Sequence, residues 1–151
     1  RHRADTNIAD DNGNTPLIKA VKLGRVDIVK CLLATTSTEV NKQNNEKNTA
    51  LHEAAFKGSK EVVDLLIAAH ADVRKQNSQG KTPFHRAVSG NHLGVAKSLL
   101  DNGADINLQD TLGYTPGHYA AFFGLLESTK FLVEHGANMD LRDHISKKTC
   151  L

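Results

Sequence analysis

The amino-acid sequence predicts an all-α solenoid, in which short helices stack in repeating units. The first observation behind this prediction is an internal period of 33 or 34 residues, which is the signature of repeat architectures. The second is that each period contains apolar residues spaced as in two short helices. Because no single unit can bury its own apolar face, neighbouring units must stack to form a core.

A recurring threonine marks the period. It occurs at Thr15, Thr49, Thr82 and Thr115, at spacings of 34, 33 and 33 residues, and a fifth copy begins at Thr149. An alanine follows each of the first four threonines by five residues, and a leucine follows by seventeen. We therefore divide this single domain into the end of a preceding repeat (1–14), repeat 1 (15–48), repeat 2 (49–81), repeat 3 (82–114), repeat 4 (115–148) and the start of a truncated repeat (149–151).

The first helix of a unit is clearest in repeat 2. Leu51, Ala54 and Ala55 form an i, i+3, i+4 stripe, which is typical of a short amphipathic helix. Thr49 can cap its N-terminus, and Gly58 is expected to end it. In the other repeats a proline directly follows the threonine, which suits the first helical turn.

The second helix of repeat 2 is expected over residues 62–66, which are more apolar than the first helix. The connection to the next unit then begins at Ala71 and Asp72. Gly80 and Gly113 stand where a tight hairpin turn requires a positive φ. Each unit is thus read as helix, turn, helix and hairpin loop.

The in-phase motif resembles that of the ankyrin repeat family, and the resemblance covers nearly the whole chain. It implies a β-hairpin and two antiparallel helices per unit, stacked into a curved array. It also implies that the last residue of the tetrad, where it is histidine, braces hairpin and helix by hydrogen bonds. The four tetrads are Thr15-Pro16-Leu17-Ile18, Thr49-Ala50-Leu51-His52, Thr82-Pro83-Phe84-His85 and Thr115-Pro116-Gly117-His118.

Composition excludes several classes of protein. The 151 residues include 19 basic and 17 acidic side chains, for a net charge of +2. Neither half is strongly basic, so we expect no nucleic acid partner. The longest apolar stretch, Tyr119–Leu126, has eight residues, whereas a membrane span needs about 20, so no membrane insertion is expected.

The two cysteines are too few to staple a secreted domain. Cys31 lies in the apolar run Ile28–Leu33, so we expect it to be buried. These features predict an intracellular protein, cytoplasmic or nuclear. The chain begins at Arg1 without a methionine, and we expect it to be a piece of a longer protein.

The histidines invite a catalytic or metal-binding interpretation, which we reject. His52, His85 and His118 recur one repeat apart, whereas zinc ligands converge on one point at about 2 Å. The pair His52 and Glu53 is explained by repeat geometry, with Glu53 in an exposed position. Without a nucleophile or phosphate-binding motif, the sequence predicts neither an enzyme nor a cofactor.

Asn41 and Asn107 each follow an acidic and a branched residue, with a leucine eight residues upstream. The family resemblance implies that such asparagines can be hydroxylated. We expect instead that each is a turn residue bonding its own loop.

The sequence predicts a non-enzymatic module that binds a segment of another protein. In the family, hairpin tips and outer positions of the first helix form the concave binding face. Repeats 1 to 3 present there a polar, mostly basic surface, and repeat 4 presents aromatics that can anchor a partner. The candidate protein-binding residues are Tyr114, Tyr119, Phe122, Phe123, Leu112, Arg86, Lys81, Phe56, Lys57, Glu53 and Lys22.

Two alternatives remain open at this point. The chain can serve as a structural spacer in a longer solenoid, with binding done elsewhere. Phe122 and Phe123 can also turn inward, because Gly117 replaces the leucine of the tetrad and leaves a void. With Ser128 and Thr129 in place of apolar residues, repeat 4 is expected to be the least stable unit.

Overall fold

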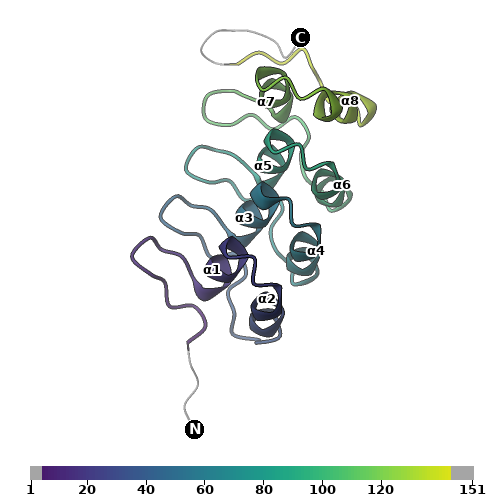
Figure 1. Cartoon of the computed structure of the whole chain (residues 1–151). Helices are drawn as coiled ribbons and strands as arrows, with labels where there is room; N and C mark the ends of the chain where they lie inside the picture. Colours follow the sequence, from purple (N-terminus) through teal and green to yellow (C-terminus); the bar gives the residue numbers. More distant parts are fainter. Residues whose placement is uncertain (1–4, 144–151) are drawn as a thin grey trace.

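A computed structural model describes residues 5–143. Its helices form pairs that stack into an elongated array, with α1, α3, α5 and α7 as an inner column and the partner helices as an outer column (Figure 1). Long loops project to one side of the inner column. In the described residues the helices are α1 (Pro16–Lys22), α2 (Val26–Leu33), α3 (Ala50–Lys57), α4 (Lys60–Ala68), α5 (Pro83–Ser89), α6 (Leu93–Asp101), α7 (Pro116–Phe122) and α8 (Leu126–Glu134). The predicted all-α solenoid is confirmed.

Each inner helix begins at the recurring threonine. The side chain of Thr15 accepts a hydrogen bond from the backbone N–H of Ile18, and Thr49, Thr82 and Thr115 form reciprocal capping boxes with the histidine three residues on. Such a box satisfies backbone donors that a helix start otherwise leaves unpaired. The local sequence therefore sets where every inner helix begins.

The core lies between successive helix pairs. Leu17, Leu51 and Phe84, which share one position of the repeat, are each at most 1% exposed. Each inner helix packs against the next one, and α4 packs against both α2 and α6. Stacking thus supplies the core that one unit lacks.

The loops between helix pairs differ from the expected β-hairpins, because no strand forms within residues 5–143. Each loop tip is closed like a hairpin, as where Asn77 N donates to Lys81 O (2.9 Å) and Gly80 N to Asn77 O (2.9 Å). Neighbouring tips, however, share a single backbone bond, such as Ser78 N to Glu46 O at 3.0 Å. One bond per pair of loops is too few to build a ladder. The glycine prediction is confirmed, since Gly80 and Gly113 have φ of 73° and 82°.

The prediction that Cys31 is buried is wrong, because Cys31 is exposed. Val29 is the fully buried residue of α2, and a residue two positions further along a helix points to the opposite side. Among the described residues no helix is long and apolar enough to cross a membrane. Cys150, the loop 144–148 and the expected repeat start at 149–151 lie outside the described residues.

Candidate functional site

The candidate residues all lie on the inner column or in the loops that lead into it. Lys22, Glu53, Phe56, Lys57, Arg86, Tyr119 and Phe122 are on inner helices, Phe123 caps α7, and Lys81, Leu112 and Tyr114 are in loops. We call this set the inner face. Its charged and aromatic side chains fall into two groups, one on repeat 4 and one across repeats 1 to 3.

The aromatic residues where repeat 3 meets repeat 4 form one continuous cluster. Tyr114 and Tyr119 contact edge to face at 5.7 Å between ring centroids, and Tyr119 stacks with Phe123 at 6.5 Å. Phe122 meets Phe123 at 5.2 Å. Phe122 is 82% exposed and Phe123 is 55% exposed. Neither ring therefore turns into the core to fill the space beside Gly117.

Tyr119 is the fixed centre of this cluster. Its hydroxyl donates to a carboxylate oxygen of Asp110, whose other oxygen accepts from the backbone of Leu112 (3.0 Å) and Tyr114 (2.9 Å). Burial and the bond to Asp110 raise the pKa of the Tyr119 phenol. The ammonium of Lys81 lies 4.7 Å from the centre of the Tyr119 ring. A tyrosine held at both its ring and its hydroxyl presents a rigid surface.

Asp110 was not among the candidate residues. It is 5% exposed and occupies the loop position that Asn44 and Asn77 occupy in earlier repeats. Both asparagines also bond the preceding loop, because their amides donate to Asn14 and Asn48. A phase comparison would have revealed the carboxylate at this position, which Asp10 shares in the first loop.

Arg86 is the central cation of the inner face. Its guanidinium lies over the ring of Phe56 at 4.3 Å from the centroid. Its Nε is buried and has no hydrogen-bond partner among the described residues. Phe56, in contrast, is 54% exposed. The pair joins repeats 2 and 3 across the inner face.

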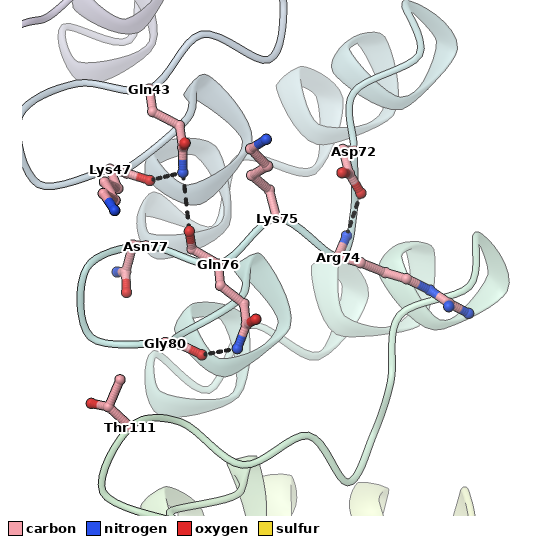
Figure 2. A pocket seen from close by; sticks show the side chains of 9 residues that line it. All are labelled: Gln43, Lys47, Asp72, Arg74, Lys75, Gln76, Asn77, Gly80 and Thr111. Carbon is pink, nitrogen blue, oxygen red and sulfur yellow. Dashed lines mark hydrogen bonds between the residues drawn. The ribbon is translucent and has the colours of Figure 1, made fainter.

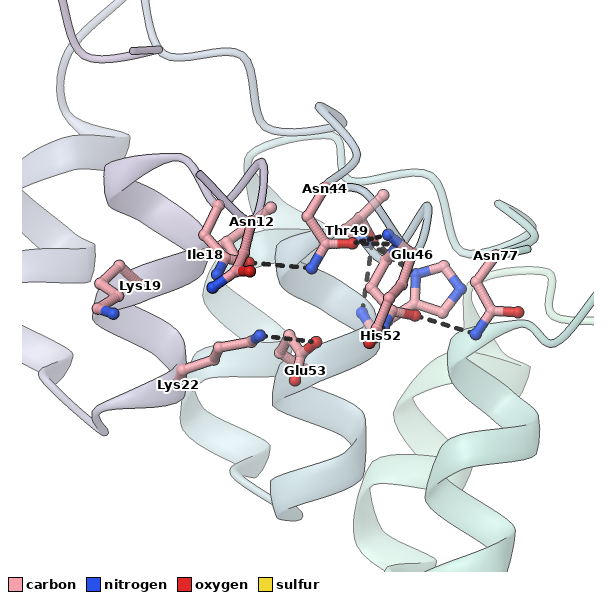
Figure 3. A network of polar contacts seen from close by, with 12 residues as sticks. Asn12, Ile18, Lys19, Lys22, Asn44, Glu46, Thr49, His52, Glu53 and Asn77 are labelled. Carbon is pink, nitrogen blue, oxygen red and sulfur yellow. Dashed lines mark hydrogen bonds and ion pairs between the residues drawn. The ribbon is translucent and has the colours of Figure 1, made fainter. Parts of the chain in front are cut away.

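Glu53 was expected to be exposed, and this is wrong. It is 7% exposed and its carboxylate lies 3.8 Å from the ammonium of Lys22 on the neighbouring helix (Figure 3). Since α3 is packed between α1 and α5, the neighbouring side chains cover this position. Glu53 and Lys22 therefore partly neutralise one another, while Lys57 and Leu112 remain exposed.

The tetrad histidines brace the loops, as the resemblance implied. The Nε2 of His52 lies 2.9 Å from the carbonyl oxygen of Lys81, and that of His85 lies 3.2 Å from the carbonyl oxygen of Tyr114. A carbonyl only accepts, so each Nε2 donates, and Nδ1 accepts from the threonine N–H. These bonds place Lys81 and Tyr114, two candidate residues, beside the inner helices.

Burial lowers the pKa of both His52 and His85 to about 4. Both rings are therefore neutral at physiological pH. Another histidine, His92, contacts the carbonyl oxygen of Phe56 through Nε2 at 3.0 Å. No group of three His, Cys, Asp or Glu side chains suited to a metal occurs within residues 5–143. His144 lies outside the described range.

The expectation that Asn41 and Asn107 bond their own loops is wrong. The side chain of Asn41 accepts from the N–H of Asp72 at 2.7 Å and donates to the carbonyl of His70 at 3.3 Å. That of Asn107 accepts from the N–H of Asn138 at 2.7 Å. Each asparagine thus ties its loop to the next repeat, because stacking brings the successive loops together.

A separate depression lies among three successive loops (Figure 2). Gln43 donates to the carbonyls of Lys47 (2.7 Å) and Gln76 (3.0 Å), which links two of these loops. Lys47 and Lys75 also line this depression. None of the inner-face candidates contributes to it.

The chain matches the family model for ankyrin repeats (3 copies) over residues 2–77 and 58–143. A repeated helix pair with a threonine cap and bracing histidines defines a stacked-repeat protein, and this match identifies which kind. The chain belongs to the ankyrin repeat family. Ankyrin repeats are general protein–protein interaction modules.

Three curated proteins are similar to parts of the chain. They are protein fem-1 homolog A-like of Mus musculus (37% identical, 46% of this chain), alpha-latroinsectotoxin-Lt1a of Latrodectus tredecimguttatus (41%, 42% of this chain) and inversin of Danio rerio (39%, 41% of this chain). The matched segments span 11%, 4% and 6% of those proteins' own lengths.

Proposed function

We propose that this chain is a non-enzymatic recognition or scaffold module that binds a segment of another protein on its inner face. The observation that carries the proposal is the aromatic cluster of Tyr114, Tyr119, Phe122 and Phe123, in which the two tyrosines are half-buried and the two phenylalanines are exposed. Exposed aromatic and arginine side chains contribute most of the binding energy at protein interfaces. Family membership supports the same role, because stacked repeats use extended concave surfaces for binding.

The rest of the inner face supports recognition rather than chemistry. The buried side chains of His52 and His85 lie at hydrogen-bonding distance from backbone atoms and hold the loops. Neither histidine is therefore free to act as a general acid or base. The proposal therefore includes no cofactor and no nucleic acid, and it retains the repeat boundaries of the sequence. An intracellular setting, cytoplasmic or nuclear, is part of the same proposal.

The test is affinity capture from cell extract followed by mass spectrometry, with the parent chain beside a Phe122→Ala/Phe123→Ala variant. A matched control is Val133→Ala, which removes an apolar side chain that is 56% exposed on the outer helix α8. We expect a partner captured by the parent and the control and lost by the double variant. If all three proteins capture nothing, the alternative of a structural spacer replaces the proposal.

A further inference from the structure

The inner face contains a cation that lacks a counter-ion. The seven ion pairs found in the described part of the chain do not include Arg86, and its buried Nε donates to no described acceptor. Leaving a buried donor of a charged group unpaired is costly. Phe56 covers one face of the guanidinium at 4.3 Å and stabilises it only in part. Nε itself is buried, so an acceptor from outside the chain would bind the terminal nitrogens of this half-buried guanidinium.

Lys81 is a second cation of the inner face, with its ammonium over the ring of Tyr119 on the next inner helix. Lys81 is half-buried, and this burial lowers the pKa of its ammonium group. The positive charge of Arg86 lowers the same pKa further, whereas the carboxylate of Asp110 raises it. The neighbouring acids are already engaged. Asp110 accepts from two backbone N–H groups and from Tyr119, and Glu53 lies against Lys22. A negative charge placed between Arg86 and Lys81 would reduce the repulsion between these two cations.

The aromatic cluster lies on the next inner helix. Packed helices are about 8–10 Å apart, and an extended peptide advances about 3.3 Å per residue. A peptide that runs along the array from Arg86 on α5 to Phe122 and Phe123 on α7 therefore crosses one repeat in about three residues. Both phenylalanines are exposed enough to receive an apolar side chain at that distance.

We propose that Arg86 and Lys81 bind a carboxylate side chain of the partner protein, and that an apolar side chain about three residues away contacts Phe122 and Phe123. This inference rests on the proposed function, and it specifies the partner's chemistry. A guanidinium binds a carboxylate with two parallel hydrogen bonds. The rings of Phe56 and Tyr119, which contact the two cations, reduce their exposure to water. The carboxylate of Asp110 beside Lys81 disfavours a doubly charged phosphate more than a singly charged carboxylate.

The test begins with a display library of random peptides, selected in parallel on the parent, on Arg86→Gln and on Lys19→Gln. Lys19 is the matched control, because it holds the same repeat position as Arg86, loses the same charge and is exposed. We expect the parent and Lys19→Gln to enrich peptides with Asp or Glu about three residues from an apolar residue. Arg86→Gln should retain the apolar preference and lose the acidic one.

Affinities of one enriched peptide provide the second part of the test. Replacing its acidic residue by the corresponding amide should weaken binding to the parent roughly 10-fold or more, since hydrogen bonds between charged groups are the strong ones. The same replacement should have little effect on binding to Arg86→Gln. If Arg86→Gln does not fold by circular dichroism, Arg86→Lys keeps the charge, loses the two-pronged geometry and should show a partial loss.

The outcomes separate the two proposals. Enriched peptides without an acidic preference, or with the same preference on Arg86→Gln, overturn this inference and leave the proposed function in place. If no peptide is enriched on the parent, the proposed function fails and this inference fails with it.

Discussion

Acidification should destabilise this fold well above the pH at which carboxylates titrate. The pKa of His52 and of His85 is about 4 in the folded chain, because both rings are buried, against an ordinary value of 6.5. A second reason is geometric: protonation places a hydrogen on Nδ1, which already faces the backbone N–H of Thr49 or Thr82. The unfolded chain therefore binds more protons than the folded chain as the pH falls below 6.5.

The size of the effect follows from these values. The stabilisation is fully present above the unfolded pKa and is lost as the pH falls toward and through the folded pKa of about 4. Between pH 7 and pH 5 each histidine should remove roughly 2 kcal/mol from the free energy of unfolding. Together His52 and His85 should remove roughly 4 kcal/mol, which corresponds to a decrease of about 2 M in the urea midpoint.

The assay is urea unfolding followed by circular dichroism at pH 7, 6 and 5, for the parent and for His52→Gln/His85→Gln. Glutamine also closes a capping box at this position but does not titrate. The variant should be less stable at pH 7, because the bonds to the carbonyls of Lys81 and Tyr114 are lost, and its stability should depend much less on pH. If parent and variant lose the same free energy between pH 7 and pH 5, the buried histidines are not the cause and the reasoning is refuted.

Three further predictions concern stability. Gly58→Ala should lower the free energy of unfolding by clearly more than the roughly 1 kcal/mol expected from backbone strain alone, because an added Cβ would lie 2.3 Å from Nδ1 of His92. The control is Gly124→Ala, which has a similar φ and no atom within 4 Å of the added Cβ, so the same unfolding assay should show the strain alone. The hydroxyl of Ser128 bonds Asn91 at 2.7 Å between repeats 4 and 3, so a double-mutant cycle of Ser128→Ala and Asn91→Gly should give a coupling of about 1 kcal/mol, and a coupling near zero would contradict that bond. Hydrogen exchange should show weaker protection over residues 119–133 than over residues 62–66, because Ala121 of repeat 4 is exposed whereas Ala55 and Val88, at the same position of repeats 2 and 3, are buried. Equal protection would contradict the prediction that repeat 4 is the least stable unit.

The features that the sequence predicted well depend on residues close together in the chain. Thr49 and His52 are three residues apart, so helical geometry alone brings their groups together. The φ of Gly80 likewise follows from its own loop. The apolar stripe of repeat 2 placed Leu51 on the buried side of its helix, because that side must face the neighbouring units.

The predictions that failed depend on which residue stands in the adjacent repeat. Glu53 is buried because α1 and α5 flank its helix, and Asn41 bonds Asp72 because the next loop lies beside it. The unpartnered Nε of Arg86 was not predictable either, since it requires knowing that the ring of Phe56 in the preceding repeat lies against the guanidinium. The sequence of a single repeat predicts the fold of that repeat, but it does not show which side chains of the adjacent repeats will contact it.

The positions that recur in every repeat and the positions that differ between repeats are physically linked in this molecule. The buried tetrad residues His52 and His85 donate to the backbone carbonyls of Lys81 and Tyr114, whose side chains are variable and lie on the inner face. The backbone of each variable residue is thereby held before any partner arrives. A surface held in place in this way loses less conformational entropy on binding, so more of the contact energy remains as affinity. If the proposed function holds, replacing His52 or His85 by glutamine should therefore weaken binding of a peptide to the inner face, although both histidine side chains are buried.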